Sequence, residues 1–210
     1  MPQTMRRLSG FVLVLLAIEL LDELVFGVRE AAWPLIRDDL RLTYVEIGLL
    51  LGVPTLISSV IEPVLGILGD IWKRRLIILG GGVAFTLALL LTGGSHTFAL
   101  LMAAFILFYP ASGAFVNLSQ AALMDYAPAR HEQNMARWTL AGSIGVVLGP
   151  LALGAAVGVG LSWRDVFLLM TALAVLLVLA ASRFPFPNGH TNGESSGGLV
   201  AGLREAFRAL

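Results

Sequence analysis

The sequence predicts an all-α membrane protein in which six transmembrane helices form one bundle. Of its 210 residues, 57% are hydrophobic and only 13% are charged, which is about half the charged share of an ordinary soluble domain. The mean hydropathy is +0.85. Six separate stretches are apolar over the roughly 20 residues that a helix needs to cross a bilayer. A soluble domain of this length has too little interior to bury so much apolar surface.

The six predicted spans cover residues 9–28, 44–69, 76–94, 98–124, 138–160 and 163–182. The first span follows Arg6 and Arg7, as the apolar part of a secretory signal does. It continues through Glu19 and Asp22 with no small-residue cleavage site before them, so we interpret it as a retained first helix. The connections are short, which predicts that neighbouring helices alternate in direction. We assign the bundle to residues 1–186.

The basic residues predict the orientation of the bundle. One set of connections and ends holds ten of the 14 Lys and Arg residues: Arg6, Arg7, Lys73, Arg74, Arg75, Arg130, Arg137, Arg183, Arg204 and Arg208. The opposite set holds Arg29, Arg37, Arg41 and Arg164. Cytoplasmic segments carry the excess of positive charge, so we expect both termini in the cytoplasm. The expected location is a plasma membrane of the bacterial inner-membrane kind.

The last part of the chain is different in composition. Residues 187–198 contain no apolar side chain and predict a flexible cytoplasmic linker. In residues 199–210, Leu199, Leu203 and Phe207 share one helical face, which predicts the start of a cytoplasmic amphipathic helix. Because this helix has only just begun at the last residue, we expect the chain to be truncated within a longer one.

Three acidic residues lie within the first predicted span. Glu19, Asp22 and Glu23 have the spacing i, i+3, i+4 and therefore share one side of a helix. Acidic residues in a membrane helix normally face the bundle interior or a water-filled cavity, where they mark ion or proton pathways. The alternative is that Asp22 and Glu23 lie near the outer surface and are simply hydrated.

The second and fourth predicted spans also carry polar groups. Glu62 belongs to a stripe of small and polar residues in the second span and is followed by Pro63, which loosens the helix. We expect Glu62 to handle protons or solute; alternatively, it only hydrogen-bonds a neighbouring helix. In the fourth span, Asn117 and Gln120 share a face that suits a polar cavity wall or, equally, an interhelical hydrogen bond.

The sequence lacks the residues that several other kinds of function require. The chain has no cysteine, so thiolate catalysis and cysteine-metal sites are excluded. Its three histidines, His96, His131 and His190, all fall in predicted connections. There is no phosphate-binding loop, and a net charge of zero gives no electrostatic argument for nucleic acid. We therefore expect no enzyme activity, no cofactor and no metal; the expected partners are a small-molecule substrate and the lipid bilayer.

Two motifs resemble a known family. In residues 66–75, the positions of Gly66, Asp70, Arg74 and Arg75 resemble the signature between the second and third helices of the major facilitator superfamily, although Ile71 and Lys73 depart from it. In the fifth span, the small-residue packing face that contains Gly145, Gly149, Pro150 and Gly154 is similar to the Gly-Pro signature of proton-coupled drug antiporters in that superfamily. The general resemblance is closest to bacterial exporters of the fosmidomycin-resistance kind.

The resemblance implies an architecture and a gate. The six spans would be two inverted three-helix repeats and the first half of a twelve-helix transporter, with the substrate path between this bundle and a missing C-terminal half. Asp70 would face the start of a helix in that half. Arg74 would pair with Asp125 to lock one state, so that Gly66, Asp70, Arg74, Arg75 and Asp125 would form a cytoplasmic gate.

We therefore expect a secondary active transporter that exports a small solute by alternating access in exchange for protons. Its proton or substrate pathway would contain Glu19, Asp22, Glu62, Asn117 and Gln120. Two alternatives remain open from the sequence. The first is a free-standing six-helix protein that works as a homodimer, and the second is a membrane scaffold or sensor that transports nothing.

Overall fold

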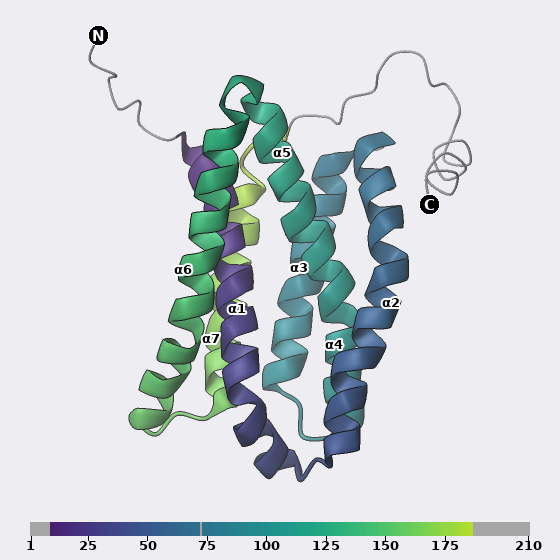
Figure 1. Ribbon diagram of the computed structural model, residues 1–210, viewed down its shortest axis with the longest axis vertical. Coiled ribbons are helices and arrows are strands. Elements are labelled where there is room, and N and C mark those ends of the chain that lie inside the picture. Colours follow the sequence, from purple (N-terminus) through teal and green to yellow (C-terminus); the bar gives the residue numbers. More distant parts are fainter. Residues whose placement is uncertain (1–8, 72, 187–210) are drawn as a thin grey trace.

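The computed structural model describes residues 9–71 and 73–186, and all of its elements within these ranges are helices (Figure 1). The predicted linker 187–198 and the predicted amphipathic helix 199–210 lie outside the described residues. The long helices are α1 (Gly10–Leu40), α2 (Tyr44–Ile71), α3 (Arg74–Gly93), α4 (Phe98–Ser112), α5 (Leu118–Tyr126), α6 (His131–Gly158) and α7 (Trp163–Ala181). A π-helical segment, η1 (Gly113–Asn117), joins α4 to α5, and a 3-10 turn, η2 (Pro128–Arg130), precedes α6.

The helices stand side by side; α4, η1 and α5 form one continuous rod, and the successive rods alternate in direction (Figure 1). Helix α1 packs against α6 and α7, α3 packs against α4 and α7, and α2 packs against α4. The α2–α3 turn, the α5–α6 connection and the start of α1 lie at one end of the bundle, at the top of Figure 1. The core between the helices is apolar and rich in phenylalanine; its fully buried rings belong to Phe85, Phe105, Phe115 and Phe167.

Within the described residues, five helical stretches are long and apolar enough to cross a membrane: Tyr44–Gly69, Arg74–Gly93, Phe98–Tyr126, Pro128–Gly158 and Trp163–Ala181. Helix α1 is not among them, although its 31 residues extend over about 46 Å. Its acidic and basic residues lower its apolar character. The structure therefore supports an all-helical membrane bundle, and a sixth span through α1 belongs to the proposal below.

The first predicted span ends too early. The prediction stopped at Val28 because charged residues follow, but the helix continues for 12 more residues to Leu40. It ends where Arg41 adopts a left-handed conformation with φ 53° and donates its backbone N–H to the carbonyl of Arg37. Charged side chains interrupt an apolar pattern, but they leave the backbone hydrogen bonds of a helix intact.

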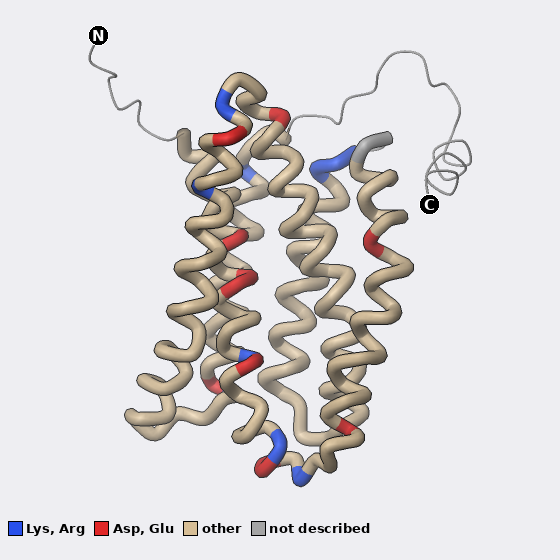
Figure 2. Tube along the Cα trace, viewed as in Figure 1, with Lys and Arg blue, Asp and Glu red and all other residues tan. Residues whose placement is uncertain are grey.

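The charges are distributed unevenly along the bundle. Figure 2 shows most Lys and Arg at the two ends of the bundle, whereas acidic residues also occur part-way along the helices. Basic residues gather at the end with the α2–α3 turn: Lys73, Arg74, Arg75, Arg130, Arg137 and Arg183. The connections that we expected in the cytoplasm therefore lie at one end of the bundle, and the cytoplasmic orientation of that end stays a prediction.

Candidate functional site

Two of the acidic residues in α1 contact α6. Glu19 is only 7% exposed. Its Oε1 lies 2.6 Å from the position that a Cβ on Gly142 would occupy. One turn further on, the Cβ of Glu23 lies 2.9 Å from the corresponding position on Gly145. The absence of side chains on α6 therefore creates the space that these two acids occupy.

Asp22, which lies between Glu19 and Glu23 in the sequence, contacts a different helix. The hydroxyl of Ser112, at the end of α4, donates a hydrogen bond of 2.8 Å to Oδ1 of Asp22. The three acids thus share one side of α1, but that side faces two neighbours, with α6 beside Glu19 and Glu23 and α4 beside Asp22.

Glu62 approaches the same part of α4 from α2. Ser58, one turn earlier in α2, donates a hydrogen bond of 2.6 Å to Oε1 of Glu62. The Cγ of Glu62 lies 2.9 Å from where a Cβ on Gly113 would be. Asp22 and Glu62 therefore come from two helices to the consecutive residues Ser112 and Gly113, where the π-helical segment η1 begins.

The π-helical segment is also enclosed from α3. A Cβ on Gly81 would lie 2.7 Å from the Cβ of Ala114, and a Cβ on Gly82 would lie 2.9 Å from the ring of Phe115. A π-helical turn contains an extra residue and often marks a functional site in a longer helix. We call the group of Asp22, Ser112, Glu62, Ser58 and Gly113 the carboxylate site.

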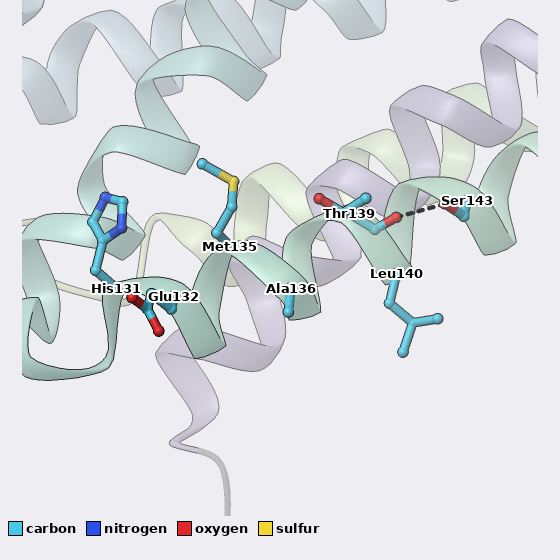
Figure 3. A pocket seen from close by; sticks show the side chains of 7 residues that line it. All are labelled: His131, Glu132, Met135, Ala136, Thr139, Leu140 and Ser143. Atoms are coloured by element: carbon cyan, nitrogen blue, oxygen red, sulfur yellow. Dashed lines mark hydrogen bonds between the residues drawn. The ribbon is translucent and has the colours of Figure 1, made fainter.

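The two predicted pathway amides follow the carboxylate site along the chain. Asn117 is exposed and ends η1, and Gln120 is half-buried in α5. The amide of Gln120 donates to the sulfur of Met135 in α6 over 3.6 Å. Met135 also lines an open groove of 710 Å³ along the first turns of α6 (Figure 3), formed by His131, Glu132, Met135, Ala136, Thr139, Leu140 and Ser143.

The helix that carries this groove begins earlier than predicted. His131, which we expected in a connection, is the first residue of α6. Helix α6 thus begins seven residues before the predicted span at Trp138, because its first two turns are polar and, apart from Asn134, mostly exposed. Its groove opens at the end of the bundle that carries most of the described basic residues.

At the same end, the predicted gate residues connect four helices. Arg74 is 2% exposed; its Nη1 forms an ion pair with Oδ2 of Asp125 in α5, and its Nε donates to the carbonyl of Gly69 over 3.1 Å. Arg75 donates from Nη2 to the carbonyl of Ser182, which follows α7, over 2.6 Å. Asp70 lies in the last turn of α2. The structure thus brings together the ends of α2, α5 and α7 and the start of α3.

The predicted gate and packing glycines differ in their surroundings. On Gly145, a Cβ would lie 2.5 Å from the carbonyl oxygen of Leu20, and on Gly149 it would lie 2.7 Å from the carbonyl oxygen of Leu24. The close approach of α1 to α6 therefore requires both glycines, and Pro150 extends the same contact toward α1. In contrast, a Cβ on Gly66 or Gly154 would meet no atom within 4 Å.

A clamp that the sequence did not predict lies at the opposite end of the bundle. Arg164 in α7 forms an ion pair through Nη1 with Oδ2 of Asp39 in α1, and Trp163 donates its indole N–H to the same oxygen over 3.2 Å. Arg164 also donates to the carbonyl of Ser95 from Nε over 3.0 Å and from Nη2 over 2.7 Å. We call these four residues the α1–α7 clamp. Its partners are more than 60 residues apart, so no local pattern could reveal it.

The surroundings of Arg29 were also not predicted, because three of its four aromatic neighbours belong to α4. Only 4% of this residue is exposed, and aromatic rings surround its guanidinium. As for metal ions, the acidic and histidine residues in the described ranges form no group of three or more that is arranged to hold one.

An all-helical bundle with five stretches that can cross a membrane and with carboxylates between its helices is an architecture that membrane transport proteins use. The model of the Major Facilitator Superfamily matches residues 15–210, and the chain therefore belongs to this superfamily of transporters. This result confirms the resemblance to the superfamily. It also assigns the chain to a family of transporters rather than enzymes.

Two similar proteins agree with this assignment. The chain is 35% identical over 113 residues to the MFS-type transporter TwmF of Talaromyces wortmannii, an alignment that covers 53% of the chain and 20% of that protein. Its fold matches a crystal structure of a bacterial homolog of the human lysosomal transporter Spinster, in an inward-facing and unoccupied conformation, with a TM-score of 0.67 and 20% identity. That match covers 97% of this chain and 49% of the other, so the chain spans about half the length of the solved transporter.

Proposed function

We propose that the chain is the N-terminal half of a secondary active transporter that exports a small solute by alternating access in exchange for protons. The observation that carries this proposal is the carboxylate site. Asp22 and Glu62 reach the same turn of α4 from two different helices, and each has a serine hydroxyl as its hydrogen-bond partner.

The carboxylate site suits proton exchange for a chemical reason. An ionised carboxylate only accepts hydrogen bonds, whereas a protonated one also donates, and a serine hydroxyl can match either state by rotating. Neither Asp22 nor Glu62 forms an ion pair among the described contacts, so a change in protonation changes the net charge at the start of η1. Such a change alters the electrostatic attraction between α4 and its neighbours α1 and α2.

The gate would hold one of the two alternating states. Arg74 and Asp125 join α3 to α5, and Arg75 joins α3 to the end of α7. Together with Gly66 and Asp70 in the last turns of α2, these contacts would keep the cytoplasmic ends of the helices together. Rocking of this bundle against a second one would separate the cytoplasmic ends of the two bundles and admit the solute.

The proposal includes a second bundle in the same polypeptide. Five glycines, Gly48, Gly52 and Gly66 on α2 and Gly154 and Gly158 on α6, have no neighbour within 4 Å of a Cβ, and the fold match covers 49% of a longer transporter. In this proposal, α1 also crosses the membrane, so that there are six spans in two inverted repeats, and both termini of this part of the chain are on the cytoplasmic side of a plasma membrane. The intact mass of the native polypeptide tests it: about twice 22.4 kDa supports two fused bundles, and 22.4 kDa supports a homodimer instead.

Proton exchange is tested in inverted membrane vesicles that have been acidified inside by respiration. A panel of small solutes is added, and the recovery of acridine-orange fluorescence reports protons that leave in exchange. Glu62→Gln should abolish the recovery at normal expression, whereas the control Glu46→Gln, in the exposed first turn of the same helix, should retain it. If Glu62→Gln shows the same fluorescence recovery as the wild type, Glu62 is not part of the mechanism. If no solute causes recovery in the wild type, a scaffold or sensor becomes the better explanation.

A further inference from the structure

Arg29 lies about 10 Å further along α1 than Asp22 and is almost completely buried. Its Cζ is 4.9 Å from the ring centroid of Phe26, 5.1 Å from Tyr109, 5.9 Å from Phe108 and 6.0 Å from Phe105. A guanidinium is attracted to aromatic faces at these distances. However, rings do not neutralise its charge, so a buried arginine in a membrane helix also needs an anion.

The anion that Arg29 has is held weakly. Both Nε and Nη2 donate to a single oxygen, Oε1 of Glu30, over 3.2 and 3.0 Å. Adjacent residues do not face each other on a helix, so the side chain of Glu30 must fold back to make this contact. That side chain is 43% exposed, whereas that of Arg29 is 5% exposed. The counter-ion of Arg29 can therefore move into water and leave the guanidinium available.

Two further hydrogen-bond donors follow Arg29 along α1 at steps of four residues. The indole Nε1 of Trp33 and the Nε of Arg37 are both buried, and neither has a hydrogen-bond partner among the described residues. Residues four apart lie on the same side of a helix, about 6 Å apart along its axis. Buried N–H groups almost always have partners, so the donors of Trp33 and Arg37 are available to an acceptor from outside the described residues.

We propose that Arg29 and Trp33 form a binding subsite for the anionic group of an amphipathic organic anion, such as a carboxylate carried by an aromatic or other apolar body. The anionic group displaces Glu30 and accepts hydrogen bonds from the guanidinium and the indole. The apolar body packs against Phe26, Phe108 and Tyr109, and Phe26 is 43% exposed and so accessible. This proposal rests on the proposed transport function, since it assigns a class of solute to the pathway beside α1.

The same chemistry fits two sources of anion. A free aromatic carboxylate and the headgroup of an anionic lipid both present oxygens beside apolar groups. A third interpretation is that Arg29 only holds α1 against α4 through its rings and Glu30, in which case no anion competes for it.

The test is equilibrium binding of radiolabelled 1-naphthoate to the full native polypeptide in phosphatidylcholine nanodiscs, with 1-naphthylmethylammonium as the cationic competitor. We expect saturable binding that the cation does not compete away. Arg29→Gln should weaken it about tenfold or more, because it removes charge-assisted hydrogen bonds. Trp33→Phe should weaken it about fivefold, since one neutral hydrogen bond is lost. Glu30→Gln should strengthen binding, because the competing carboxylate is gone.

Several results overturn the proposal: no saturable binding to the wild type, equal affinity in Arg29→Gln, or competition by the cation. If Arg29→Gln does not fold, Glu30→Gln still tests the proposal. Unchanged or weaker binding of 1-naphthoate to that variant refutes the claim that the anion displaces Glu30 from Arg29. Adding phosphatidylglycerol to the nanodiscs distinguishes the two sources. If this anionic lipid displaces 1-naphthoate, the subsite belongs to a lipid headgroup. If 1-naphthoate binding is unchanged, the subsite belongs to a free solute. Binding is measured without transport, so intact binding together with absent proton exchange overturns only the transport proposal.

Discussion

The tightest contact in the bundle lies between α1 and α6, and a single methyl group on Gly149 tests it. A Cβ on Gly149 would lie 2.7 Å from the carbonyl oxygen of Leu24, 2.7 Å from the amide nitrogen of Val28 and 2.8 Å from the carbonyl carbon of Gly27. Ordinary contacts begin at 3.4 Å, so α1 and α6 must separate by about 0.7 Å. All three atoms belong to the backbone of α1, and no side chain can rotate to relieve the overlap.

The expected cost of Gly149→Ala follows from two opposing effects. Overpacking of a well-packed interior destabilises a protein by about 1–3 kcal/mol. Alanine is a better helix former than glycine, which returns about 1 kcal/mol. The control Gly80→Ala, at an exposed position in α3 where a Cβ meets no atom within 4 Å, has only the second effect. The difference in unfolding free energy between the two variants therefore isolates the clash, and we expect about 1–3 kcal/mol.

The assay is reversible unfolding of the purified protein in mixed detergent micelles, with an increasing fraction of a denaturing detergent and helix content as the signal. Gly149→Ala should unfold at a lower fraction than the wild type, and Gly80→Ala at the same or a higher fraction. If the two alanine variants are equally stable, α1 and α6 are not in backbone contact at this crossing, and the packing argument is wrong.

Three further substitutions test other contacts. Asp125→Asn removes the charge that pairs with Arg74, and thermal unfolding should show a loss of about 1.5–3 kcal/mol; unchanged stability contradicts the buried ion pair. Arg164→Gln opens the α1–α7 clamp and should destabilise by a similar amount of about 1.5–3 kcal/mol, with increased amide hydrogen exchange at the end of α1 as the local signal. Ser112→Ala removes the hydrogen bond to Asp22 and should slow proton exchange in inverted vesicles at normal expression; an unchanged rate excludes this serine from the pathway.

The sequence predicted the spans best where an apolar run decides them. The predicted span 163–182 and helix α7 (Trp163–Ala181) agree almost to the residue, because Ser162 caps the helix with Asp165 directly before the apolar run. The end of α1 and the start of α6 were placed wrongly, because each helix extends into polar sequence. Hydropathy detects the part of a helix that lies in lipid, and the rest of the helix depends on backbone hydrogen bonds and caps.

The candidate site was only partly predictable for a different reason. Glu19, Asp22 and Glu62 stand out in the sequence because an acid within an apolar run is rare. Their partners do not stand out: Ser112 is 90 residues from Asp22, and the π-helical segment leaves no trace in the apolar pattern. Arg29 was counted only as an outer charge, because its rings are contributed largely by α4. Which neighbour a membrane helix turns toward depends on packing across the whole bundle, and a single sequence does not record it.

The central claim is that the side of the bundle with Asp22, Glu62 and Asn117 faces a water-filled path rather than lipid. The chain contains no cysteine, so single cysteines can be introduced directly, with any elsewhere in the polypeptide replaced. Asn117→Cys tests the path, and Leu176→Cys, at a residue of α7 that is 62% exposed, is the lipid-facing control. The measurement is labelling by a membrane-impermeant thiol reagent in intact cells and inverted vesicles. We expect Asn117→Cys to react with the reagent and Leu176→Cys to remain unlabelled. Equal inertness of the two would contradict the central claim.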